Sequence, residues 1–265
     1  MEWWWLAYLV VGLIVGFFAG LLGIGGGIII VPLLVMVFGG QHFPEDRVLH
    51  LALGTSIASI VFTSMSTVRA HQRHGTVRWD ILREVTPGVI VGTLLGTAFA
   101  NALPSRYLAV FFIVFAFYSA LQMGLDIKPA PTRQLPGRIG MTAAALALGG
   151  LSSLIGVGGG FLAIPMMTLC NVPMRNAIGT SAAIGLPLAI SGALGYIYAG
   201  RNMDHLPPFS LGYVYLPALA GIVIGTFITV PVGARAAHRL PVAKLKQIFG
   251  IVLLVLATKM LLSLF

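Results

Sequence analysis

Residues 23–27 read Gly-Ile-Gly-Gly-Gly, and residues 156–160 read Gly-Val-Gly-Gly-Gly. Four further landmarks follow both glycine runs in the same order: a proline (Pro32, Pro165), Gly-Thr-Ser (54–56, 179–181), Gly-x3-Gly-Thr (92–97, 221–226) and Leu-Pro (103–104, 240–241). Recurrence of several landmarks in one order indicates that the chain consists of two copies of one repeat, each about half of its length.

Five apolar segments surround these landmarks in each half. They cover about 3–22, 28–38, 48–68, 85–103 and 107–125 in the first half, and about 139–155, 161–171, 177–199, 211–231 and 245–264 in the second. Most reach the roughly 17–25 residues that a membrane-spanning helix needs. Segments 28–38 and 161–171 are shorter, at about 16 Å as helix, and each follows a glycine run. Two geometries stay open for the first two segments of each half. They form either a long helix with a tilted, extended partner, or a re-entrant hairpin that dips into the membrane and returns. Either places a backbone break at depth, which is tolerated only where it faces protein or a cavity.

The composition excludes a soluble protein. Hydrophobic residues make up 58% and charged residues 9% of the 265 residues, whereas soluble domains carry about 25% charged residues. The surface must therefore face membrane lipid, and the single Cys170 forms no intrachain bridge. The net charge of +9 does not indicate nucleic-acid binding, because the basic residues stand in short loops between apolar runs.

The distribution of Lys and Arg predicts the topology. If successive loops alternate sides, four of the 16 basic residues lie on one side, namely Arg47, Arg106, Arg201 and Lys259, and the rest lie on the other. The positive-inside rule makes the richer side cytoplasmic and places both termini outside the inner (plasma) membrane. The predicted units are a first membrane repeat at 1–126, a cytoplasmic linker at 127–138 and a second repeat at 139–265.

An odd number of segments per half inverts the second half relative to the first. The predicted fold is therefore an all-α integral membrane protein with two inverted repeats of five apolar elements, each with a broken or re-entrant Gly-rich segment. This pattern is typical of a transporter with a binding site near the middle of the membrane.

The glycine runs are the main candidate site. Glycine lets backbone N–H groups approach a ligand, and a helix that starts at the break directs its positive end toward an anion. The alternative is close helix packing by small residues. The predicted substrate-binding glycines are Gly25, Gly26, Gly27, Gly158, Gly159 and Gly160.

Polar side chains near the two Gly-Thr-Ser motifs extend this site. Thr55, Ser56, Thr180 and Ser181 offer neutral hydroxyls to an oxyanion, or they bond back to their own helix carbonyls. Basic residues precede each motif by about one turn: His50 in the first half, and Arg175 with its neighbour Asn176 in the second. His50 is alternatively a structural histidine, and Arg175 an interface anchor.

Other chemistries lack support in the sequence. All seven acidic residues fall in predicted loops or termini, so no carboxylate is expected within a span. The histidines at 71 and 74 stand among arginines without a cysteine, which does not favour a metal site. No catalytic residue or cofactor is expected. Gly88, Gly92 and Gly96 would serve packing within the chain rather than a dimer interface, and the oligomeric state is not predicted.

The paired motifs, Gly-Ile-Gly-Gly-Gly-x4-Pro at 23–32 and Gly-Val-Gly-Gly-Gly-x4-Pro at 156–165, each followed by Gly-Thr-Ser, resemble those of the sulfite exporter TauE/SafE family. The segment His-Gly-Thr-Val-Arg-Trp at 74–79 fits the same family. The resemblance covers essentially the whole chain and implies a permease for small sulfur-containing anions such as sulfite or sulfoacetate. The family is often described as having eight helices, whereas ten apolar segments are counted here. The expected function is export of such an anion by alternating access. The alternatives are an anion channel on the same scaffold, and a membrane enzyme or its assembly subunit.

Overall fold

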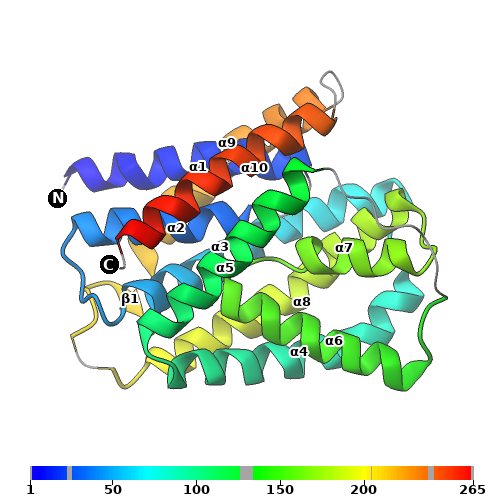
Figure 1. The fold of residues 1–265 in the computed structure, drawn as a ribbon, viewed down its shortest axis with the longest axis horizontal. Coiled ribbons are helices and arrows are strands. Elements are labelled where there is room, and N and C mark those ends of the chain that lie inside the picture. The colour runs from blue at the N-terminus through cyan, green and yellow to red at the C-terminus, as the bar shows by residue number, and fades with distance from the viewer. Residues whose placement is uncertain (1, 23–25, 126–133, 204, 238–241, 264–265) are drawn as a thin grey trace.

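The fold was analysed in a computed structural model that describes residues 2–22, 26–125, 134–203, 205–237 and 242–263 (Figure 1). The helices are α1 (Glu2–Leu22), α2 (Gly27–Gly40), α3 (Val48–Arg73), α4 (Trp79–Ala102), α5 (Ser105–Gly124), α6 (Arg138–Ile155), α7 (Gly160–Leu169), α8 (Met174–Gly200), α9 (Leu216–Ala237) and α10 (Val242–Leu262). Each apolar segment predicted from the sequence therefore corresponds to one helix.

Seven helices in the described part of the chain are long and apolar enough to cross a membrane, namely α1, α3, α4, α5, α6, α8 and α9. The shorter apolar helices are α2, α7 and the described apolar part of α10, Gln247–Leu262. The molecule is thus a multi-pass helical membrane protein, as its composition indicated.

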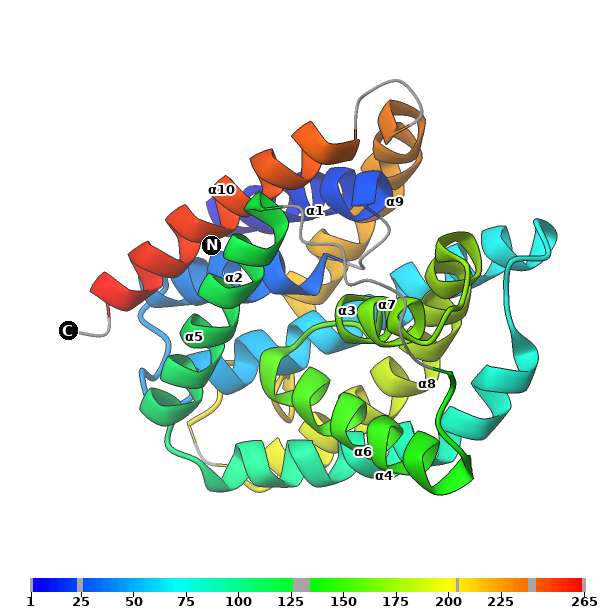
Figure 2. The ribbon, with the colours of Figure 1, turned by 45° about the vertical axis from the view of Figure 1, so that its right-hand side comes forward.

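The helices pack mainly across the two halves of the sequence. The first helix of each half lies along the fourth helix of the other, so that α1 packs on α9 and α6 packs on α4. Figure 2 shows these two pairs on opposite sides of the bundle. The third helices, α3 and α8, pack on each other, and so do the fifth helices, α5 and α10. Exchanging the halves therefore maps the α1–α9 and α4–α6 contacts onto each other, and the α3–α8 and α5–α10 contacts onto themselves.

Glycines make these close pairings possible. A Cβ added at Gly92 of α4 would lie 2.8 Å from the Cα of Leu146 on α6, and one added at Gly225 of α9 would lie 2.6 Å from the backbone N of Leu13 on α1. Such contacts are closer than real side chains allow. The predicted use of Gly88, Gly92 and Gly96 in packing within the chain is confirmed, since all three lie against α6.

The short helices α2 and α7 begin directly after the glycine runs. Figure 1 shows that they start near the middle of the bundle and run toward opposite ends. α7 has 10 residues, so it spans about 15 Å, or half of a hydrocarbon core of about 30 Å. The choice between a tilted partner of a long helix and a re-entrant hairpin stays a prediction.

A small hairpin was not predicted. Residues Ser210–Leu211 (β1) and Val214–Tyr215 (β2) pair antiparallel before α9 begins at Leu216, five residues later than expected. Gly212 occupies the turn with φ +56°, a conformation that suits glycine at the first position of a two-residue hairpin loop. The apolar run at 211–215 is therefore a partly buried hairpin before α9, and not part of a longer helix.

Candidate functional site

The two glycine breaks meet in the centre of the protein. A Cβ added at Gly27, the first residue of α2, would lie 2.5 Å from the carbonyl O of Gly156 and 3.1 Å from the Cα of Val157. The side chain of Ile60 lies against both breaks, 3.0 Å from the Cβ position at Gly27 and 3.3 Å from that at Gly158. The two breaks therefore converge.

The breaks differ in their backbone conformation. In the first half Gly26 is left-handed with φ +69° and precedes α2 as its N-cap. In the second half the left-handed residue is Gly156, with φ +70°, at the end of α6, whereas the N-cap of α7, Gly159, is right-handed. Gly26, Gly27 and 158–160 are all buried. Gly25 lies outside the described residues.

Ser56 holds the breaks together. Its hydroxyl donates a hydrogen bond to the carbonyl O of Gly156 at 2.8 Å and lies 3.4 Å from the carbonyl O of Gly27. The matching residue, Ser181, donates to the carbonyl of Ile178 in its own helix at 2.9 Å. The second motif thus shows the local bonding that the sequence left open as an alternative.

The two motif threonines make equivalent contacts at opposite ends of the bundle. Thr55 Oγ1 accepts from the backbone N–H of Tyr215 at 3.0 Å, directly before α9. Thr180 Oγ1 accepts from the backbone N–H of Arg78 at 2.9 Å, directly before α4. Both threonines are fully buried. Each one ties the third helix of one half to the fourth helix of the other.

His50 lies on α3 and is buried against the turn between α4 and α5. One ring nitrogen lies 3.0 Å from the carbonyl O of Ala100, the other lies 3.1 Å from Ser105 Oγ, and the ring stacks on Tyr213 at 5.1 Å. Both nitrogens therefore have partners within the protein. The contacts place His50 at the end of the bundle that carries the hairpin, away from the glycine breaks.

The hairpin contributes residues that the sequence analysis did not single out. Burial raises the pKa of Tyr213, so its hydroxyl stays protonated and donates to Asn101 Oδ1 at 3.0 Å. The same hydroxyl accepts from Arg47 at 3.0 Å. The signal for this hairpin was available in the residues Leu-Gly-Tyr-Val-Tyr after two prolines, which is typical of a short turn between strands.

Arg175 and Asn176 lie at the opposite end of the bundle, in the first turn of α8. Arg175 is exposed, and the side-chain amide of Asn176 donates to the carbonyl O of Thr76 at 3.2 Å. Nearby, the guanidinium of Arg78 donates to the carboxylate of Asp80 at 2.9 Å, and this hydrogen bond raises the pKa of Arg78. These contacts fix the loop before α4.

The geometry separates most of the predicted residues into two groups, apart from Ser181, which bonds within α8, and Arg175, which is exposed. The described glycines and Ser56 lie at the crossing of the breaks, where α2 and α7 begin and carry partial positive charge. Thr55, Thr180, His50 and Asn176 hold loops at the two ends of the bundle. Among the described residues no group of three His, Cys, Asp or Glu side chains is placed to hold a metal ion.

Comparisons with known proteins agree with these features. The sequence profile described as sulfite exporter TauE/SafE matches residues 8–260. A probable membrane transporter protein of Haemophilus influenzae is 37% identical over 257 residues, which cover 96% of this chain and 97% of the relative. The probable membrane transporter protein YdhB of Bacillus subtilis is 28% identical over 241 residues, with 88% and 91% covered. No solved structure matches the chain. The profile match over nearly the whole length, together with the paired glycine breaks, shows that the chain belongs to the sulfite exporter TauE/SafE family.

Proposed function

We propose that this membrane transporter exports a small oxyanion of sulfur, such as sulfite or an organosulfonate like sulfoacetate, across the inner membrane. The crossing of the two glycine breaks supports this proposal most strongly. Two helix N-termini, α2 and α7, begin there from opposite directions, and a helix N-terminus favours negative charge. The anionic head would bind backbone N–H groups at Gly26–Gly27 and 158–160, with Gly25 in the same run.

Neutral donors suit a transported anion. A buried lysine or arginine would be costly when empty and would retain the anion when paired. The described part of the crossing contains backbone amides, and Ser56 bonds the carbonyl O of Gly156 beside them; no ionisable side chain is among its contacts. Binding by such groups leaves the site stable when empty and allows release.

Alternating access would use the two halves as inverted repeats. The exchange of contacts between halves, with α1 on α9 and α6 on α4, supports this arrangement. In the proposed topology the loop before α4 faces the cytoplasm, the hairpin faces the outside, and both termini lie outside. The two halves would then rock about the crossing, so that it opens to one side at a time.

Flux measurements in proteoliposomes test the proposal. Radiolabelled sulfite or sulfoacetate should accumulate with saturation, and unlabelled anion on the other side should accelerate exchange. Gly159→Ala adds a methyl group at the break, where the nearest atom is the Cγ2 methyl of Ile184 at 3.2 Å. A shift of a few tenths of an ångström accommodates it, so the protein should fold and lose at least tenfold in flux. Gly150→Ala, where the nearest atom is 3.5 Å away, is the control.

Each alternative has its own result in this assay. Unitary currents without exchange would identify an anion channel on the same scaffold. Binding of the anion without flux would identify a membrane enzyme or an assembly subunit. Equal flux in Gly159→Ala and Gly150→Ala would contradict the proposed site.

A further inference from the structure

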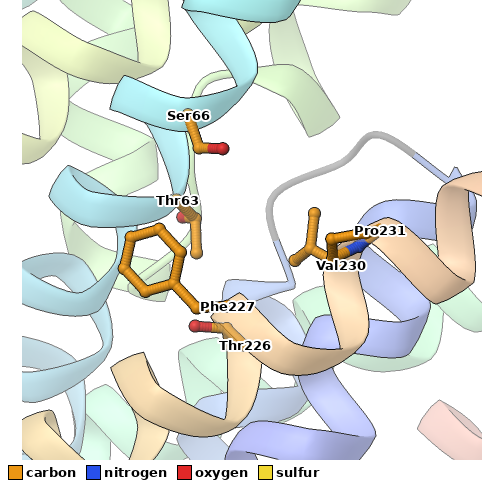
Figure 3. Close-up of a pocket in the computed structure, with 6 residues that line it drawn as sticks. All are labelled: Thr63, Ser66, Thr226, Phe227, Val230 and Pro231. Atoms are coloured by element: carbon orange, nitrogen blue, oxygen red, sulfur yellow. The ribbon is translucent and has the colours of Figure 1, made fainter.

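A cavity of about 50 Å³ lies between α3 and α9. Figure 3 shows its lining, with Thr63 and Ser66 on α3 opposite Thr226, Phe227, Val230 and Pro231 on α9. The volume exceeds the roughly 10–15 Å³ that one water molecule needs. Three of the six lining side chains carry hydroxyls, so the cavity is suited to water and to a small polar solute.

The cavity lies about one turn along α3 from the crossing of the glycine breaks. Ile60, which lies against Gly27 and Gly158, precedes Thr63 by three residues on α3, and residues at this spacing share one face of a helix. Ser66 lies one turn further toward the end of the helix. The cavity therefore lies along α3 between the buried crossing and the end of the bundle that holds the loop before α4.

The equivalent interface in the other pair of helices, between α4 and α8, is closed. Exchange of the halves maps α3 and α9 onto α8 and α4. There a Cβ at Gly195 of α8 would lie 2.9 Å from the Cβ of Thr97 on α4, and one at Gly192 would lie 3.2 Å from the Thr93 side chain. When the two Gly-Thr-Ser motifs are aligned, the positions on α3 that match these glycines hold Thr67 and Ala70. The tight α4–α8 interface thus has glycines on α8 where α3 has larger residues in the sequence.

Two arginines stand at the outer end of the cavity walls. Arg69 follows Ser66 by three residues on α3, and Arg235 follows Pro231 by four residues on α9. Both arginines are exposed, and neither helix contains an acidic residue. The field at the mouth is therefore positive, which raises the local concentration of anions.

We propose that the α3–α9 cavity is the access path through which the anion moves between the crossing of the glycine breaks and the side of the basic loops. Arg69 and Arg235 attract the anion to its mouth, and the tight α4–α8 interface closes the equivalent path on the other side. This inference rests on the proposed anion transport. It adds the route, the side to which the structure is open, and the residues that select for negative charge.

Cysteine modification in lipid nanodiscs tests the path. In a Cys170→Ser background, Ser66→Cys and its counterpart Ser191→Cys would be treated with the anionic sulfonatoethyl methanethiosulfonate and with its trimethylammonium analogue. Ser66→Cys should react at least tenfold faster than Ser191→Cys, since Ser191 is only 6% exposed. A cysteine at 66 that faced lipid instead of water would not react with either reagent.

The charge at the mouth has a separate readout. In the Ser66→Cys protein, Arg69→Gln combined with Arg235→Gln should slow the anionic reagent several-fold at low salt, and the difference should vanish at high salt because the charges are screened. The cationic reagent should react faster in the same variant. Arg83→Gln, which removes an exposed charge from α4, should change neither rate.

Flux in the same preparations separates this inference from the proposed function. Modification of Ser66→Cys should block flux of sulfoacetate, which does not itself react with the reagents. If the unmodified protein carries sulfite or sulfoacetate but Ser66→Cys is unreactive, or reacts without loss of flux, the access path is wrong and the proposed function stands. If the unmodified protein carries neither anion, the proposed function fails, and the access path fails with it.

Discussion

The hydroxyl oxygen of Thr55 accepts a hydrogen bond from the backbone N–H of Tyr215 at 3.0 Å. These residues belong to different halves of the chain and join the N-terminal half of α3 to the start of α9. Thr180 makes the equivalent bond to the N–H of Arg78 at 2.9 Å, at the other end of the bundle. The Gly-Thr-Ser motif therefore has a defined structural use in both halves, which is to attach the third helix of one half to the fourth helix of the other.

Removal of these hydroxyls should lower stability in both halves. Thr55→Val and Thr180→Val each leave a backbone N–H without its partner, which costs about 1–3 kcal/mol when the group is buried. The thermal unfolding midpoint in detergent should fall for each valine variant. Thr55→Ser and Thr180→Ser keep the accepting oxygen and should unfold near the wild-type midpoint. Unchanged midpoints in both valine variants would show that these bonds do not matter.

The two motif serines should differ, because their bonds differ. Ser56→Ala removes the hydrogen bond that reaches Gly156 in the other break, so the flux of sulfite or sulfoacetate should fall at least several-fold. Ser181→Ala removes a bond within α8 and should leave flux within about twofold of wild type, since such local bonds are weak. Equal losses in the two variants would contradict the assigned role of Ser56.

His50 should support structure without contacting the substrate. His50→Phe retains a ring against Tyr213 but loses both polar contacts, to Ala100 and Ser105. We expect the free energy of unfolding to fall by about 1–3 kcal/mol, and the thermal unfolding midpoint to fall with it. The concentration of anion at half-maximal flux should stay unchanged. A several-fold increase in that concentration, with an unchanged midpoint, would instead make His50 a binding residue.

Glycines between paired helices should not tolerate larger residues. Gly92→Leu would place side-chain atoms into the backbone of Leu146, which lies 2.8 Å from the Cβ position, and overpacking of this kind costs about 1–3 kcal/mol or more. Yield and unfolding midpoint should fall. Gly124→Leu, where no atom lies within 4 Å of the Cβ position, should behave like wild type in the same expression and melting assays.

Much of the fold could be predicted from the sequence. Length and hydropathy identify each apolar segment, and the glycine runs mark both breaks. The hairpin before α9 was missed, since the apolar residues at 211–215 continue the hydropathy of the following span. Its packing against Gly54 and His50 depends on tertiary contacts, which periodicity does not report.

The candidate site was predictable in part. The glycine runs indicated where the backbone breaks at depth, because such a break must face protein or a cavity, but not that the two breaks cross. The bonds of Thr55 and Thr180 to distant N–H groups could not be read from the motif, since a threonine in a membrane helix has several possible partners. The α3–α9 cavity depends on which helices pair, and that information lies in contacts between halves.

The central claim is that the crossing of the two glycine breaks binds a small sulfur oxyanion. Thermal unfolding of the purified protein with sulfite, sulfoacetate, isethionate, taurine, thiosulfate, sulfate and phosphate tests it most directly, because a ligand of the native state stabilises it by about 2.7 kcal/mol at 100 times its Kd. We expect sulfite or an organosulfonate to raise the midpoint of the wild-type and Gly150→Ala proteins, but not that of Gly159→Ala. No shift with any of these anions, or an equal shift in Gly159→Ala, would contradict the claim.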